Sequence, residues 1–201
     1  MFNASFQFKF NGTLIRTVKN QTPFTDNGVN MIESIPKQNS LELKLADGAF
    51  YATLLSNHDS YAGYRPYRQF DGDIGKTKLA GALYLTLPGI PFVYYGEELG
   101  LDTYTSSKSD KWLRNCMIWD ETANSGFTDA KNAWNMINAN DEEQNKLMNA
   151  AAQAKDPNSI LNHYKKIINI RKNNKALSLG DFEAVDSKNN LVNSYLRILG
   201  N

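Results

Sequence analysis

The sequence predicts an α/β fold, in which parallel strands and helices alternate along the chain. Short apolar runs of strand length alternate with longer stretches that carry apolar residues at helical spacing. The run at residues 49–56 is almost continuously apolar, as expected for a strand covered on both faces of a parallel sheet. In such a sheet or barrel, reactive groups gather at the carboxyl ends of the strands. Polar residues directly after a strand are therefore the first candidates for a site.

Composition narrows the class of protein. The 201 residues are 41% hydrophobic and 11% aromatic, which is typical of a globular protein with one large or two small domains. Lys and Arg number 22 against 21 Asp and Glu, and no basic cluster is present, so we expect neither nucleic acid nor a membrane as partner. One cysteine, Cys116, excludes an internal disulfide and a multi-cysteine zinc site. We find no signal peptide or membrane-spanning run.

The first strand-then-helix step is predicted at the amino terminus. Phe6, Phe8 and Phe10 alternate with polar residues, which predicts a short strand over residues 6–10. Residues 12–20 follow as a helix.

The second step begins with the strand at 49–56. After a polar loop, Leu79, Leu83 and Leu87 recur at helical spacing, which predicts a helix over 76–87 that the following Pro-Gly ends.

The third strand is predicted over 91–96, from its aromatic and β-branched residues. We interpret Glu97 and Glu98, which come after it, as a helix start or ion-pair members. The next stretch, 101–156, is too long for an ordinary loop and is rich in Trp, Asn and Asp, so it predicts a functional excursion with short helices.

The carboxyl-terminal elements are a helix and two strands. The helix lies within residues 156–174, capped by Asn158 or Ser159. Two strands, at 180–185 and 190–199, come next and are joined by a turn.

Asn57, His58 and Asp59 form the candidate site, because they follow the strand at 49–56. A carboxylate there can bind sugar hydroxyls, stabilise a developing positive charge, or act as an acid or base. Two simpler interpretations stay open. An Asn- and Asp-rich strand end can be a turn or helix cap, and His58 can be a hydrogen-bonded structural histidine.

Four motifs in this order resemble the α-amylase family, glycoside hydrolase family 13. They are LLSNHD at 54–59, LPGIPFVYYGEELG at 87–100, WLRNCMIWD at 112–120 and RKNNKALSLGDF at 171–182. The form NHDSYAGYR is most similar to bacterial members that lie between α-amylases and oligo-1,6-glucosidases.

The resemblance implies a partial (β/α)8 TIM barrel. Residues 1–178 would supply its strands six to eight with their helices, including the excursion at 101–156, and residues 179–201 would begin a truncated carboxyl-terminal β domain. Family members cleave α-glucosidic bonds with retention, using an Asp nucleophile and a Glu acid/base after the fourth and fifth strands. Neither has a counterpart here, so we expect this chain alone to be inactive.

The resemblance also implies roles for single residues. Asp59 corresponds to the family's third acidic residue, which stabilises the transition state, and His58, Asn57 and Arg65 correspond to substrate-binding positions. The implied partners are an α-glucan or malto-oligosaccharide substrate and the missing amino-terminal half of the barrel. No cofactor is expected in this chain. Calcium is compatible with the missing part of the full-length enzyme, which we call the parent. Whether the parent is secreted, periplasmic or cytoplasmic stays open.

Two other functions share these motifs. One is a transglycosylase or isomerase of the trehalose synthase type. The other is a non-catalytic carbohydrate-binding or assembly subunit. The two missing carboxylates upstream would separate a catalytic parent from the second alternative.

Overall fold

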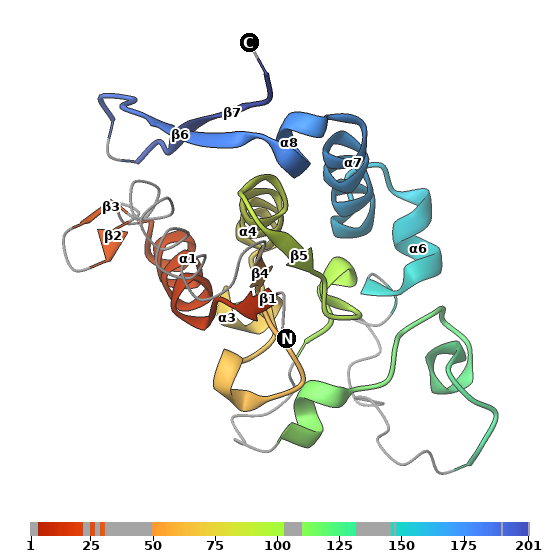
Figure 1. The fold of residues 1–201 in the computed structure, drawn as a ribbon. Helices are drawn as coiled ribbons and strands as arrows, with labels where there is room; N and C mark the ends of the chain where they lie inside the picture. The colour runs from red at the N-terminus through yellow and green to blue at the C-terminus, as the bar shows by residue number, and fades with distance from the viewer. Residues whose placement is uncertain are drawn as a thin grey trace. The chain divides into compact units, whose positions relative to one another are not determined.

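Three parallel strands form a sheet in the computed structural model, in the order β1–β4–β5 (Figure 1). β1 is Ala4–Phe6, β4 is Phe50–Leu54 and β5 is Ile90–Phe92. The parallel pairing predicted for these strands is confirmed. The structure describes residues 4–21, 25–26, 29–30, 50–102, 110–131, 146, 148–189 and 191–200.

The chain divides into two compact units. The first contains residues 1–54, 79–92 and 167–201, and therefore the sheet. The second contains residues 55–78 and 93–166, and therefore the segments that come after β4 and β5 in the chain. Every candidate site residue predicted from the sequence lies in the second unit.

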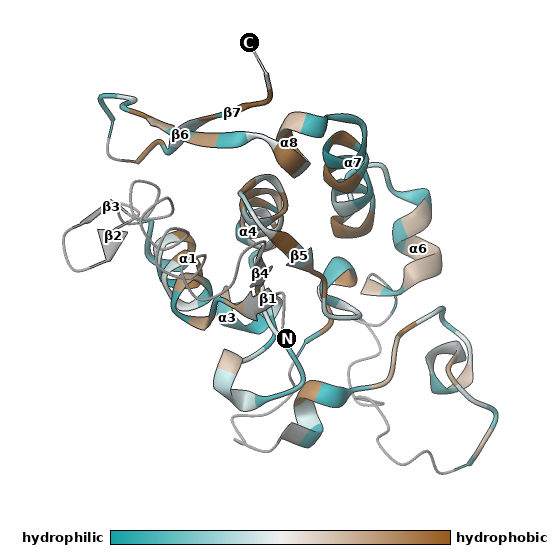
Figure 2. Cartoon of the chain, in the orientation of Figure 1, coloured by the Kyte–Doolittle hydropathy of each residue, from teal (hydrophilic) through white to brown (hydrophobic). Residues whose placement is uncertain are grey.

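β4 is the central strand and is buried, as predicted. Tyr51, Ala52, Thr53 and Leu54 are all at most 9% exposed. A strand that alternates neither in polarity nor in burial is covered on both faces. β5 is shorter than the predicted strand at 91–96, although its colouring in Figure 2 confirms its apolar character.

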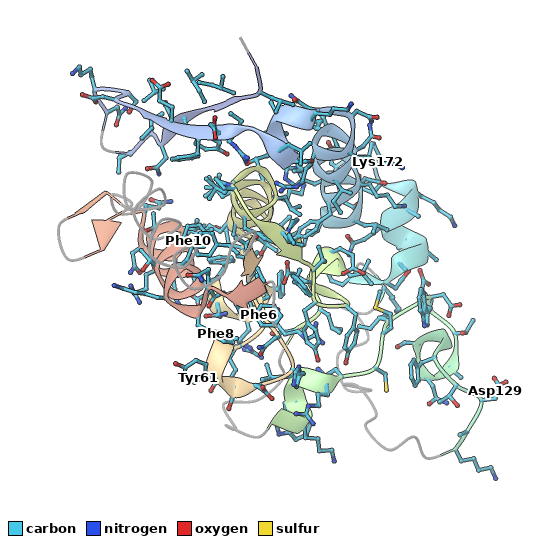
Figure 3. The ribbon with its side chains drawn as sticks, viewed as in Figure 1. Phe6, Phe8, Phe10, Tyr61, Asp129 and Lys172 are labelled. Carbon is cyan, nitrogen blue, oxygen red and sulfur yellow. The ribbon has the colours of Figure 1, made fainter. Side chains whose placement is uncertain are left out.

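The predicted strand over residues 6–10 is wrong beyond Phe6. β1 ends at Phe6, and α1 (Phe8–Asn20) includes Phe8 and Phe10 (Figure 3). Period-two spacing fits these three phenylalanines, but a helix places the apolar residues after Phe10 on the same buried face. The buried residues of α1 recur at helical spacing: Phe10, Asn11, Thr13, Leu14, Ile15, Thr17 and Val18.

α4 (Ile74–Thr86) confirms the predicted second helix. Asp73 caps its start, because its Oδ1 accepts the Lys76 N–H at 2.9 Å. The buried face differs from the predicted leucine stripe, since Leu79 is 52% exposed. The helix is apolar on several sides, so spacing alone does not select its face. The buried side chains are Thr77, Ala80, Tyr84 and Leu85.

α7 (Ile160–Asn173) confirms the last predicted helix. Ser159 is its cap, since the Asn162 N–H donates to Ser159 Oγ at 3.1 Å. α8 (Lys175–Leu179) comes next. The two predicted strands then appear as β6 (Asp181–Val185) and β7 (Ser194–Ile198), which pair antiparallel (Figure 1).

The remaining elements are short. The stretch 101–156 contains the short helices predicted for it, although residues 103–109, 132–145 and 147 of it, Trp134 among them, lie outside the described residues. The short elements of the whole chain are β2 (Thr25–Asp26), β3 (Val29–Asn30), α3 (Pro66–Gln69), α6 (Ala150–Lys155) and the 3-10 helices Ser60–Ala62, Glu97–Leu99, Asp110–Arg114 and Ala123–Gly126.

Candidate active site

The segment after β4 changes from buried to exposed within five residues. Leu55 and Ser56 are 0% and 2% exposed, Asn57 is half-buried, and the His58 side chain is 60% exposed. Asn57 turns the chain here, because its Oδ1 accepts the Asp59 N–H at 2.8 Å. The predicted turn interpretation of Asn57 therefore holds, and this turn presents the next two side chains to solvent.

Asp59 is the centre of a small polar cluster. Its side chain is 48% exposed, and its Oδ1 lies 3.3 Å from His58 Nε2 and 3.4 Å from Arg114 Nη2. Arg114 also donates from Nε to the His58 carbonyl oxygen at 3.2 Å. A half-exposed carboxylate held between an imidazole and a guanidinium keeps oxygen lone pairs available to the hydroxyl groups of a ligand.

Arg114 is the residue of this cluster that the sequence interpretation missed. It stands in the quoted motif WLRNCMIWD, but that motif alone gives it no role. It is 55 residues from Asp59 along the chain, so spacing gives no signal that the two side chains meet.

Arg65, which is predicted to contact the substrate, is fully buried in this structure. It is 0% exposed, and so has no surface for a sugar contact in this structure. Its guanidinium donates from Nη1 to the Tyr95 carbonyl oxygen at 2.5 Å and from Nη2 to the Leu113 carbonyl oxygen at 2.8 Å. Burial lowers the pKa of this guanidinium, while Tyr94, Tyr95 and two nearby glutamates raise it.

Two tyrosines stack against Arg65 and reach the same loop. The guanidinium carbon lies 4.4 Å from the Tyr94 ring centroid and 4.8 Å from that of Tyr95, within cation–π range. The Tyr94 hydroxyl donates to the Leu113 carbonyl oxygen at 3.0 Å, and the Tyr95 hydroxyl to the Asn115 carbonyl oxygen at 2.6 Å. Burial raises the pKa of the Tyr94 hydroxyl and is the largest of the influences on that pKa.

Glu97 is a structural residue in this unit, which agrees with its interpretation from the sequence. It is 1% exposed. Its Oε2 accepts the Ser56 hydroxyl at 3.1 Å and its Oε1 accepts the Tyr164 hydroxyl at 3.0 Å. A buried carboxylate with hydroxyl donors on both oxygens joins the segment after β4 to the segment after β5 and to α7.

Gly96 makes the turn that places Glu97 there. Its φ is +79°, a left-handed conformation that glycine adopts without steric cost. A Cβ at this position would lie 2.6 Å from Leu101 Cδ2, so the site also lacks room for any other residue.

No metal site is found among the residues that the structure describes. Within them, no three His, Cys, Asp or Glu side chains gather closely enough to hold an ion. In that same part of the chain, no helix has the length and apolarity needed to cross a membrane. Cys116, the one cysteine, packs against Leu101 and Ile118.

Comparison with known proteins decides the family. The family model described as "Alpha amylase, catalytic domain" matches residues 1–180. The chain belongs to the α-amylase family of glycoside hydrolases. The resemblance seen in the four motifs is thereby confirmed.

Individual α-amylase family members agree. Alpha-amylase 3 of Dictyoglomus thermophilum is 33% identical over 196 residues, which cover 96% of this chain and 35% of that protein. Oligo-1,6-glucosidase of Parageobacillus thermoglucosidasius is 27% identical over 186 residues, covering 73% of this chain and 32% of that protein. The crystal structure of alpha-amylase from H. orenii superposes with a TM-score of 0.77 at 26% identity, over 98% of this chain and 37% of that one.

These comparisons fix the fold at the level of class. The chain has an α/β barrel-type fold of the α-amylase family, and it spans about a third of the length of the two relatives just named. The roles of the single site residues stay predictions.

Proposed function

We propose that this chain is the carboxyl-terminal part of the catalytic barrel of a retaining glycoside hydrolase that acts on α-glucosidic bonds of starch-type glucans. The observation that carries the proposal is the half-exposed Asp59 carboxylate, held between His58 and Arg114 in a member of the α-amylase family. Relatives named as an alpha-amylase and an oligo-1,6-glucosidase support an α-glucan as the substrate class.

Asp59 stabilises the transition state in this proposal. As the glycosidic bond breaks, the sugar ring gains oxocarbenium-like positive charge and flattens. A fixed carboxylate lowers the energy of that charge and accepts hydrogen bonds from sugar hydroxyls that strengthen as the ring distorts. His58 donates to the same sugar, and Asn57 holds the turn through its bond to the Asp59 N–H.

The nucleophile and the acid/base belong to the missing barrel half. Retention requires two carboxyl groups about 5 Å apart on either side of the bond. Glu97 is engaged with Ser56 and Tyr164, so it does not serve as the partner of Asp59. Residues 1–201 alone are therefore inactive in our proposal. We assign residues 1–178 to barrel strands six to eight and their helices, and residues 179–201, with the antiparallel pair β6–β7, to the next domain.

The direct test is Asp59→Asn in an enzyme that joins these residues to the rest of the barrel. We expect kcat on maltotriose to fall by at least about 10²-fold, because the charge is lost while the shape is kept. His58→Ala is the matched variant and lowers kcat less, since the histidine binds sugar without stabilising charge. Circular dichroism establishes that both variants are folded. Normal turnover in Asp59→Asn would sink the assignment.

Product analysis separates the alternatives. Starch, maltose and isomaltose are incubated with the same enzyme, and the products are separated by chromatography. Free glucose and shorter maltodextrins support hydrolysis. Trehalose or another rearranged disaccharide supports the isomerase alternative. Binding of the glucan without any product supports the non-catalytic one.

A further inference from the structure

Arg65 is a fully buried charged side chain six residues after Asp59. Its two terminal nitrogens donate to backbone carbonyl oxygens, one of Tyr95 and one of Leu113. Burying a guanidinium is costly unless its donors are satisfied and its charge is compensated. Here the faces of Tyr94 and Tyr95 and the fields of two glutamates provide part of that compensation.

The carbonyl groups that Arg65 and the two tyrosines bind flank one residue. Leu113 O receives both Arg65 Nη2 and the Tyr94 hydroxyl, and Asn115 O receives the Tyr95 hydroxyl. The residue between these two fixed peptide groups is Arg114. Its backbone position is thus set by three hydrogen bonds from other segments of the same unit.

Arg114 in turn meets the candidate catalytic group. Its side chain donates to the His58 carbonyl oxygen at 3.2 Å and reaches Asp59 Oδ1 at 3.4 Å. A continuous set of contacts therefore runs from Arg65 through Leu113 and Arg114 to Asp59.

We propose that Arg65, with Tyr94 and Tyr95, is a positioning clamp that holds Arg114 against Asp59. The inference rests on the proposed function, because it takes Asp59 as the group that acts in the transition state. In this assignment Arg65 does not make the sugar contact that the sequence predicted. It acts by positioning Arg114. Lysine retains the charge but lacks a planar fork that reaches two carbonyl groups at once, so Arg65→Lys loosens the clamp.

A double-mutant cycle in the full-length enzyme tests the clamp. Arg65→Lys is made alone and combined with Arg114→Ala, and kcat and KM on maltotriose are measured for each. We expect Arg65→Lys alone to lower kcat by about tenfold, because a small displacement of a catalytic group is costly. In the Arg114→Ala background the same change should lower kcat by less than about twofold, since the residue it positions is gone.

Arg68→Lys is the matched control. Arg68 lies three residues further along, 43% exposed, and pairs with Asp102 at 3.1 Å. Arg68→Lys is the same chemical change at a position outside the clamp, so kcat should stay within about twofold of the unmodified enzyme. Thermal unfolding establishes that each variant is folded. If Arg65→Lys does not fold, Tyr95→Phe replaces it in the cycle, because this change removes only the bond to the Asn115 carbonyl oxygen.

The outcomes are distinct. If Arg65→Lys lowers kcat by the same factor with and without Arg114, the two residues are not coupled and the clamp is overturned. The same holds if KM alone changes, since that indicates a direct substrate contact. Activity that survives Asp59→Asn overturns the proposed function itself. An inactive Asp59→Asn together with an additive cycle overturns the clamp and leaves the proposed function standing.

Discussion

Single side chains in this protein carry charge at very different depths. Asp59 is half-exposed beside a histidine and an arginine, Glu97 is buried with two hydroxyl donors, and Glu98 is largely buried. Within the described part of the chain, Glu98 Oε2 has no hydrogen-bond partner. Two adjacent glutamates thus differ in how well their burial is compensated.

Glu98 gives stability a pH dependence of known sign. Burial raises the pKa of its carboxyl group above that of an unfolded chain, although backbone hydrogen bonds and Arg65 oppose this. The folded state therefore binds this proton more tightly than the unfolded state. It gains stability as the pH falls through the raised pKa and loses it as the carboxylate forms.

We therefore expect Glu98→Gln to stabilise the protein at pH 8. The amide carries no charge to desolvate, so the melting temperature should rise by roughly 2–4 °C. The gain should shrink near pH 4, where the native carboxyl group is protonated. Glu183→Gln, on the exposed side of β6, is the control and should shift the melting temperature little at either pH. Differential scanning calorimetry measures both. An equal gain at the two pH values would contradict this assignment.

Residue types at strand ends were predictable, but their partners were not. The Asn57–Asp59 cluster stands out in the sequence because polar residues follow an apolar run. The contact with Arg114 depends on loops that close across 55 residues, which no local pattern encodes. The family resemblance assigns Arg65 to the substrate from its position shortly after Asp59. Its complete burial comes from tyrosines about 30 residues further on.

At the scale of elements, the end of α4 depends on one side chain of α7. Arg171 donates from Nη1 to the carbonyl oxygens of Leu85 at 2.8 Å and Leu87 at 3.0 Å, and from Nη2 to that of Gly89 at 2.5 Å. Leu85 lies in the last turn of α4, where backbone acceptors have no intrahelical donor and the helix dipole favours a cation. Leu87 and Gly89 lie in the turn between α4 and β5.

Arg171→Met should lower the free energy of unfolding by about 2 kcal/mol, because three acceptors lose a charged donor. Lys172→Met is the matched control. Lys172 is the next residue of α7 and is exposed (Figure 3), so its loss should change the free energy by less than about 0.5 kcal/mol. Urea unfolding at low protein concentration measures both values. Equal effects would show that Arg171 does not support the end of α4.

Element types were predictable to a greater extent than their boundaries and faces. Helices and strands with strong periodicity, such as α7 and β4, appear where the pattern indicates them. The boundary between β1 and α1 was wrong because Phe8 and Phe10 fit both periods. The buried face of α4 was wrong in part because an all-round apolar helix takes its orientation from its neighbours.

At the scale of the whole molecule, the sheet of the first unit has two edge strands. In the described part of the chain, β1 and β5 each pair only with β4. Phe6 and Phe92, from these two strands, are 43% and 46% exposed, and their ring centroids lie 4.9 Å apart. Unpaired strand edges beside exposed aromatic groups favour association with other chains.

Residues 1–201 expressed alone should therefore self-associate and release no reducing sugar from starch or maltose. Light scattering and a reducing-sugar assay measure the two properties. Phe92→Lys places a charge beside the edge and should lower the associated fraction. Trp119→Lys is the control, because Trp119 is 50% exposed but belongs to the second unit. A stable monomer that hydrolyses starch would refute the assignment of the two missing carboxylates to another part of the enzyme.

The position of the one cysteine gives the loop of Arg114 a built-in reporter. Cys116 lies two residues after Arg114 and is half-buried between Leu101 and Ile118. Its thiol reacts fastest with a labelling reagent when this part of the chain opens, so the labelling rate measures the local opening equilibrium. No other thiol in the sequence competes for the reagent. A fluorinated label at this position would report by NMR whether a bound oligosaccharide tightens the loop.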